Sequence, residues 1–168
     1  MKQLLSRLFI IAGMLLFSAD AIAATQSVTA NISFDTPLSL TKVSDISIGA
    51  VKALTASTYT ITTAGVVTAT GSGVWLYGTK TVGNITIAGS TTDTINISVG
   101  GYTAQNGVTP ANATCAYNGG GAGSCTIASA VAPGAGKTLL IGVDAQVSGT
   151  QAAGTTATPT FTVTVVYN

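Results

Sequence analysis

Period-two alternation is the feature that most constrains the fold of this chain. From residue 26 onward, apolar and polar side chains alternate in short runs, and no segment carries a 3.6-residue period over a useful length. Val, Ile and Thr dominate these runs, and all three favour extended backbone. The pattern predicts strands at residues 27–34, 38–42, 45–51, 57–62, 66–70, 74–77, 81–88, 94–99, 124–128, 139–147 and 160–167.

Glycine-rich stretches separate the predicted strands and act as turns or loops. They lie at residues 64–65, 70–73, 100–101, 118–121 and 133–136. Regularly spaced short strands of this kind are typical of a β-sandwich or barrel. We therefore expect one all-β domain, a sandwich over residues 37–168.

The N-terminal segment has the composition of a secretory signal. Lys2 and Arg7 precede an apolar run at residues 8–17, and Ala21-Ile22-Ala23 supplies small residues for cleavage. We predict a signal peptide over residues 1–23, Sec-dependent export, and passage through the periplasm to the cell surface. The apolar run is too short to span a bilayer, and no later run is longer, so we predict no transmembrane helix.

Charge is sparse in the rest of the chain. Residues 24–168 carry four Lys and four Asp, far below the usual quarter of all residues. No basic patch is available to neutralise phosphates, which argues against nucleic acid as a partner. A nearly neutral surface rich in Thr, Ser, Gly and Ala tends to associate, as the subunits of an assembled polymer do.

The two cysteines, Cys115 and Cys125, enclose a glycine-rich loop. In an exported chain such a pair predicts a disulfide. The chain has no His and no C-x-x-C motif, so a metal site or redox pair is the weaker interpretation.

The exported part of the chain lacks the residue types that catalysis or cofactor binding would require. Residues 24–168 contain no His, Glu or Arg, so neither a Ser-His-Asp triad nor a Cys-His pair can be assembled. The stretch 134–138 (G-A-G-K-T) resembles part of a phosphate-binding loop, but Val131 replaces the required first Gly and a strand is expected to follow. We predict no enzyme, no cofactor and no metal.

An aromatic pair offers a candidate ligand surface. Trp75 and Tyr77 alternate with Val74 and Leu76, so they share one face of their predicted strand. Exposed aromatic rings can stack on sugars, and Tyr102 and Tyr117 in glycine-rich surroundings could join them. Core packing is the alternative role for such residues.

The first and last predicted strands of the exported chain are both apolar on one face. The last presents Phe161, Val163, Val165 and Tyr167. The first, within residues 24–36, presents Val28, Ala30, Ile32 and Phe34. Either strip has to be covered by a neighbouring strand, because each buried large side chain contributes about 1.5–3 kcal/mol.

These two ends carry a family resemblance. Residues 29–51 (T-A-N-I-S-F-D-T-P-L-S-L-T-K-V-S-D-I-S-I-G-A-V), residues 151–155 (Q-A-A-G-T) and the ending F-T-V-T-V-V-Y-N resemble the bacterial domain-of-unknown-function 4402 family. That family is similar to fimbrial subunits of the chaperone-usher type and to spore-coat-U-like secreted proteins. The resemblance implies an immunoglobulin-like, pilin-type sandwich that lacks its final strand.

The resemblance also implies partners and roles. In chaperone-usher pilins the penultimate aromatic belongs to the C-terminal strand beside the missing one, and Tyr167 matches that position. Val28, Ala30, Ile32 and Phe34 match the donor extension that fills the gap in a neighbouring subunit, which gives a homopolymer. A periplasmic chaperone and an outer-membrane usher are the further partners implied.

Two hypotheses therefore stand. In the first, the chain is a structural subunit of a bacterial surface fimbria assembled by strand donation between copies. In the second, it is a self-complete secreted sandwich that acts as an adhesin or carbohydrate-binding module, with residues 27–34 paired in their own domain. A stable monomer would favour the second hypothesis.

Overall fold

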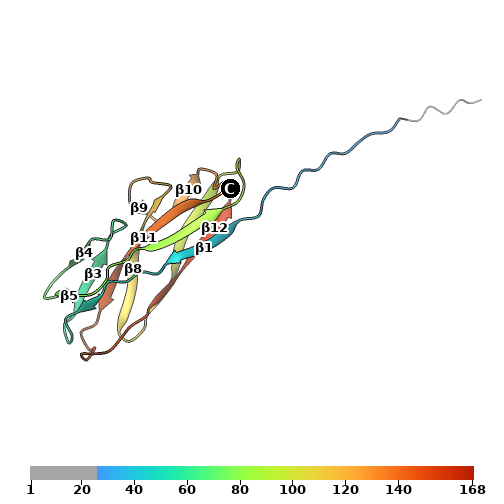
Figure 1. The fold of residues 1–168 in the computed structure, drawn as a ribbon. Coiled ribbons are helices and arrows are strands. Elements are labelled where there is room, and N and C mark those ends of the chain that lie inside the picture. The colour runs from blue at the N-terminus through green and yellow to red at the C-terminus, as the bar shows by residue number, and fades with distance from the viewer. Residues whose placement is uncertain (1–25) are drawn as a thin grey trace, which may run out of the picture. The chain divides into compact units, whose positions relative to one another are not determined.

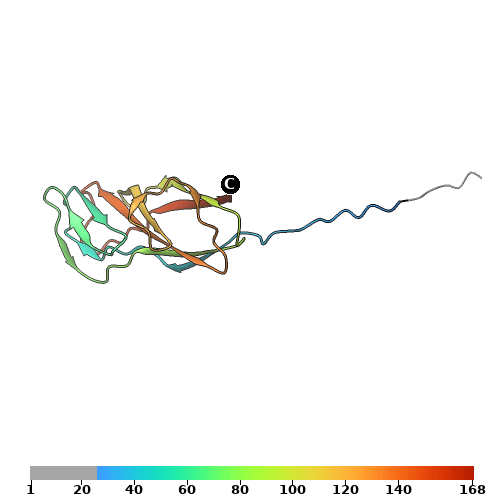
Figure 2. The same ribbon diagram turned by 90° about the horizontal axis from the view of Figure 1, so that it is seen from above.

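A computed structural model describes residues 26–168, so the predicted signal peptide lies outside the described residues. The chain divides after Phe34, and Asp35–Asn168 forms one compact unit, here called the body. The described residues contain twelve strands and no helix. The all-β sandwich predicted from the alternating pattern is confirmed (Figures 1 and 2).

The larger sheet has seven antiparallel strands around one long central strand. Its members are β1 (Ser39–Ser44), β3 (Ser57–Ile61), β4 (Val67–Ala69), β6 (Gly83–Ala88), β8 (Val108–Tyr117), β9 (Gly123–Ser124) and β11 (Lys137–Val147). One edge of β11 pairs first with β6 and then with β3, and the opposite edge pairs with β8. The path β1-β6-β11-β3-β4 leaves β1 as a terminal strand of this sheet.

Gly142 lies at the point where the neighbour of β11 changes from β6 to β3. A Cβ atom added at Gly142 would lie 2.8 Å from the carbonyl carbon of Thr62 and closer still to the carbonyl oxygen of Ile61. Any side chain would therefore push against backbone that cannot rotate away. The absence of a side chain at this position allows two strands to share one edge of β11.

The second sheet has three strands in the order β10-β7-β12, where β7 is Ile95–Thr103, β10 is Ile127–Ala130 and β12 is Thr160–Tyr167. A separate two-stranded sheet joins β2 (Ala50–Val51) to β5 (Trp75–Tyr77). All these pairings are antiparallel. In this arrangement β12 is a terminal strand of its sheet, as β1 is of the other.

The core lies between the two large sheets. Its buried cluster comprises Ile87, Ile95, Ile97, Cys115, Cys125, Ala130, Leu139 and Ile141. The isoleucines and the leucine have at most 1% of their surface exposed. Alternate residues of the central strands point inward, which is the physical content of the period-two pattern.

Several predicted strands differ from the observed ones. Residues 45–51 are mostly irregular, with a bridge from Ser47 to Thr81 and only β2 as a strand. Residues 124–128 are divided between β9 and β10 around Cys125. The sequence did not predict β8, and it predicted a turn at residues 100–101, where β7 instead continues to Thr103.

Residues 26–38 form no strand in the structure, so the predicted strand at 27–34 is wrong for the isolated chain. A strand requires a neighbour to hydrogen-bond with, and these residues pair with none in the described chain. Their apolar side chains are therefore left in solvent, with Val28 and Phe34 both 92% exposed and Ile32 75% exposed.

Candidate functional site

The free edge of β12 is the most distinctive feature of the body. Within the described residues β12 pairs only with β7, through a register that runs from Thr160 opposite Thr103 to Tyr167 opposite Ile95. The backbone N–H and C=O groups that point away from β7 therefore meet no strand. Such an edge is a template for another extended segment.

The inward face of β12 is only half-buried. Phe161, Val163, Val165 and Tyr167 pack against the core cluster, yet each remains partly exposed, whereas Ile95 and Ile97 of the adjacent β7 are almost fully buried. The alternate residues, mostly Thr, are exposed. The apolar strip predicted from the sequence is therefore present on β12, and its burial is incomplete.

The opposite sheet also ends on this side of the body, at β1. Figures 1 and 2 show β1 and β12 at the same side of the sandwich, one in each layer. Leu38, just before β1, packs against the same core cluster as the β12 strip. Leu40 within β1 remains 43% exposed. An extended segment placed between β1 and β12 would cover apolar surface from both sheets.

Tyr167 connects this site to the start of the body. Its hydroxyl accepts a hydrogen bond from the backbone N–H of Ser90 at 2.7 Å and donates one to the carbonyl oxygen of Thr36 at 2.5 Å. Gly89 leaves room for the hydroxyl, because a Cβ atom there would overlap it. The tyrosine therefore joins β12, the β6–β7 loop and the residues that lead into β1.

Two carboxylates flank this junction. Hydrogen bonds from the Ser90 side chain and the Thr36 backbone, with the interaction with Asp93, lower the pKa of Asp35. The interaction with Asp35 is also the largest cause of the raised pKa of Asp93. The two carboxyl groups therefore interact, and the pKa of Asp93 is higher than that of Asp35.

We expect Tyr167→Phe to lower the free energy of unfolding by about 1–3 kcal/mol. The change removes the acceptor of the Ser90 N–H, and Ser90 is fully buried, so water cannot replace that acceptor. Urea unfolding of the purified chain measures the effect. Tyr77→Phe is the matched control, because Tyr77 is 70% exposed and should lose little. Equal stability of the two variants would contradict this role for Tyr167.

The disulfide predicted from the sequence is present. Cys115 on β8 and Cys125 after β9 are joined, their Cα atoms are 4.8 Å apart, and both side chains are buried in the core cluster. The described residues contain no free cysteine. Beside the disulfide, an open depression of about 410 Å³ is lined mainly by loop glycines and by Tyr117, Ile127, Ala130 and Val131.

Three of the four aromatic residues considered for sugar contact make contacts within the chain. The Trp75 Nε1–H donates to the carbonyl oxygen of Ile48 at 2.7 Å, and Lys80 Nζ lies 3.8 Å from the centroid of the Trp75 ring. Tyr102 accepts a hydrogen bond from the Ala113 N–H, and its ring centroid lies 6.0 Å from that of Phe161. Each of these rings already has a partner within the chain.

Tyr117 and Tyr77 complete this comparison. The Tyr117 hydroxyl donates to the carbonyl oxygen of Val131, and burial raises the pKa of Tyr117. Tyr77 remains exposed on β5. The four aromatic residues thus come from β5, β7 and β8, and Tyr77 is the one of the four that presents a largely open ring.

The remaining ionisable residues have structural partners or lie on the surface. Asp144 accepts hydrogen bonds from Thr60 Oγ1 and Asn112 Nδ2. Lys137 begins β11, so the phosphate-loop-like stretch 134–138 leads into a strand, as predicted. Among residues 26–168 no group of three or more His, Cys, Asp or Glu is arranged to hold a metal ion.

The same residues contain no helix long and apolar enough to cross a membrane. Comparison with known proteins adds no relative: no protein-family model matches the chain, and neither does any curated protein or solved structure.

Proposed function

We propose that this chain is a structural subunit of a bacterial surface fimbria or filament, assembled by strand donation between copies. Residues 24–36 of one copy add to the free edge of β12 in another. One observation carries the proposal. The body has an unpaired strand edge with a half-buried apolar face, while a segment with a matching apolar alternation lies exposed in the same chain.

Strand addition satisfies both partners. Backbone groups of the donor pair with the free N–H and C=O groups of β12, which supplies affinity whatever the side chains are. Val28, Ile32 and Phe34 then leave solvent and pack beside the β12 strip. At about 1.5–3 kcal/mol for each large side chain, this burial contributes roughly 5–9 kcal/mol before the cost of ordering the segment.

Donation between copies explains the exposed segment better than pairing within one chain. Residues 26–38 pair with no strand of their own body. A contact in which one surface of a copy binds a different surface of the next does not close on itself, and it generates a filament.

The other properties of the chain agree with this role. The predicted signal peptide and the buried disulfide fit an exported protein. Tyr167 takes the role that the family resemblance assigns to the penultimate aromatic, and the sandwich is then of the immunoglobulin-like pilin type. A free acceptor edge also requires protection before assembly, so a periplasmic chaperone and an outer-membrane usher belong to the proposal.

Negative-stain microscopy of the exported chain tests the proposal directly. We expect filaments from the chain that begins at residue 24, and only single particles from a chain that begins at Asp35. The shorter chain keeps the whole body, so its folding is checked by its thermal unfolding transition. Filaments from the shorter chain would rule out strand donation. A stable monomer from the longer chain would favour a self-complete secreted adhesin or carbohydrate-binding module.

A further inference from the structure

The body has two ends that can be defined by hydrogen bonds. At the first, Tyr167 contacts Thr36 and Ser90, and the N–H of Asn168 donates to the carbonyl oxygen of Thr94. Asp35 and Asp93 lie here, and we call it the acidic end. The last residues of β12 and the first residues of the body therefore share this end.

The second end gathers the loops beside the start of β12. Gln105 accepts a hydrogen bond from the N–H of Thr158, Gln151 Nε2 donates to the carbonyl oxygen of Asn106, and the N–H of Leu54 donates to the carbonyl oxygen of Gln151. This chain of contacts runs from the residues before Thr160 to the loop that follows β2. β12 thus begins near the second end and finishes at the acidic end.

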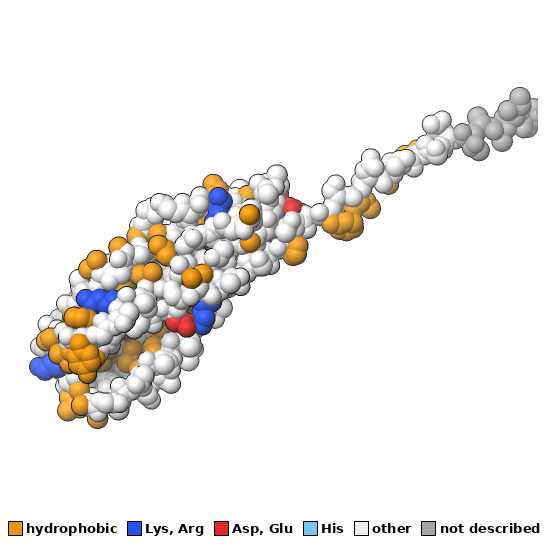
Figure 3. Space-filling model, in the orientation of Figure 1, with side chains coloured by type: hydrophobic (Ala, Val, Ile, Leu, Met, Phe, Trp, Pro, Cys, Tyr) orange, Lys and Arg blue, Asp and Glu red, His pale blue; other side chains and the backbone are white. Residues whose placement is uncertain are grey.

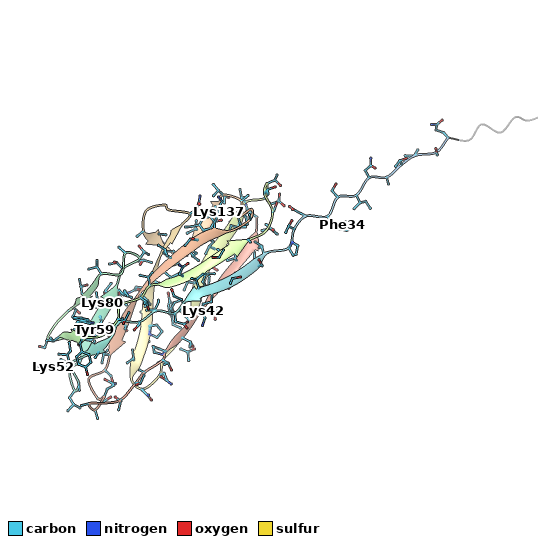
Figure 4. The ribbon with its side chains drawn as sticks, viewed as in Figure 1. Phe34, Lys42, Lys52, Tyr59, Lys80 and Lys137 are labelled. Carbon is cyan, nitrogen blue, oxygen red and sulfur yellow. A yellow bond between two sulfur atoms is a disulfide. The ribbon has the colours of Figure 1, made fainter. Side chains whose placement is uncertain are left out.

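Two lysines mark this second end, here called the basic end. Lys52 directly follows β2, and its N–H donates to the carbonyl oxygen of Val74. Lys80 follows β5 and lies over the ring of Trp75. Figure 4 shows Lys52 and Lys80 at the end of the body away from Lys137, which begins β11 in the same half as the acidic end.

Among residues 26–168 the acids and lysines that define the two ends form no salt bridge within the chain. The one salt bridge of the described residues joins Asp45 at 2.9 Å to Lys42, which Figure 4 shows in the middle of the body. A hydrogen bond between the two carboxyl groups is the largest cause of the raised pKa of Asp93, and repulsion by the Asp35 charge adds to it. Figure 3 shows lysines and apolar side chains together at the basic end, where Leu54 is 71% and Tyr77 70% exposed.

We propose that the basic end of one copy docks on the acidic end of the next, with Lys52 and Lys80 facing Asp35 and Asp93. The proposal rests on the strand-donation function proposed above and adds a second contact to it. The partner is a second copy, because the same chain carries the complementary charges and little other charge. Leu54 and Tyr77 are covered in the same contact.

Donation brings the two ends close to one another. Asp35 directly follows Phe34, so a donor segment on β12 carries the acidic end of its own body with it, and the docking is effectively intramolecular. If the donor runs antiparallel to β12, Asp35 emerges beside Thr160, near the basic end. A parallel donor would place two acidic ends together, which like charges oppose. The charges therefore select the antiparallel direction.

Charge reversal on each side tests the contact in the exported chain. We expect Lys52→Glu/Lys80→Glu and Asp35→Lys/Asp93→Lys each to slow filament growth about tenfold at low salt, and the loss to shrink as salt screens the charges. An equimolar mixture of the two variants should restore growth, because every contact between unlike variants is complementary. Lys42→Glu, which reverses one charge at mid-body where the lysine variant reverses two at the basic end, is the control and should grow like the unmodified chain.

Light scattering follows growth, and microscopy confirms filaments. Asp93→Lys alone preserves the hydrogen bond from the Thr36 N–H to Asp35, so it separates loss of the contact from loss of the fold. Growth of both reversed variants at the unmodified rate would overturn the docking contact and leave strand donation intact. A mixture that stays slow would overturn charge complementarity. If the unmodified chain formed no filament at all, strand donation and this contact would both be wrong.

Discussion

A chain carrying Ile32→Asp and Phe34→Asp is expected to stay monomeric at concentrations where the unmodified chain forms filaments. Both side chains are exposed in the isolated chain, so the body should fold and unfold as before. On donation, however, each Asp would have to enter an apolar site beside the β12 strip without a cationic partner, and burying an unpaired carboxylate is strongly unfavourable. Size-exclusion chromatography with light scattering measures the outcome.

The matched control uses the alternate face of the same segment. Asn31→Asp and Ser33→Asp introduce the same two charges one residue earlier, at positions that still face solvent after the strand has been added. This control should assemble nearly as well as the unmodified chain. Loss of assembly in both variants would mean that charge itself blocks assembly, and the side-chain register proposed here would be wrong.

A synthetic peptide of residues 24–36 provides the complementary measurement on the body that begins at Asp35. A peptide that binds only the folded body stabilises it by about 2.7 kcal/mol when present at a hundred times its dissociation constant. We therefore expect the peptide to raise the thermal unfolding temperature. The peptide with the Ile32→Asp and Phe34→Asp changes should leave that temperature unaltered.

The alternation of apolar and polar residues correctly predicted strands that pair regularly with their neighbours. The last strand was predicted at residues 160–167 and is observed as Thr160–Tyr167. Its inward residues were also identified correctly, because one face of the strand packs on the core while the other meets water. Where local pattern and tertiary packing agree in this way, the sequence is sufficient.

The sequence did not predict β8 because its residues include types that usually interrupt a strand. Pro110 and Asn112 interrupt the run, and Asn112 has a φ of 48°, in the left-handed region. The structure accommodates Asn112 in a register shift opposite Gly142 and Asp144, where Asn112 Nδ2 donates to the Asp144 carboxylate, and Pro110 lies opposite Ala145 beyond the shift. Pairing with the long β11 overrides the local preference, and only the folded partner reveals this.

β7 was predicted too short for a related reason. Two consecutive glycines ordinarily mark a turn, yet Gly101 with φ of 63° lies in the strand at a register shift between Thr160 and Thr162 of β12. The contacts of Tyr167 were also beyond prediction, since they join residues 77 and 131 positions apart. Nothing in the local sequence singles out Gly89 or Ser90 for that role.

Residues 27–34 show more clearly what an alternating sequence pattern cannot predict. Their alternation records which side chains require burial, but not which molecule buries them. Within residues 26–168 of one copy nothing buries them, and the half-buried strip of β12 lacks a neighbour there for the same reason. Both halves of the candidate site could thus be predicted from the sequence, whereas the structure was needed to show that residues 26–38 form no strand within one copy.

Removal of the disulfide should have the largest effect on the stability of the body itself. We expect Cys115→Ala/Cys125→Ala to lower the free energy of unfolding by about 3 kcal/mol, because the short closed loop no longer restricts the unfolded chain. Loss of two buried sulfur atoms from the core cluster adds to this cost. Thermal unfolding of the variant, and of the unmodified chain with and without reductant, measures the effect.

Assembly of the same variant separates stability from function. The disulfide joins β8 to the residue after β9 in the seven-stranded sheet, whereas the free edge belongs to β12 in the other sheet. Below its unfolding temperature the variant should therefore still form filaments, at a rate close to that of the unmodified chain. A folded variant that failed to assemble would show that the loop around Cys125 takes part in the contact between copies, which strand addition at β12 does not require.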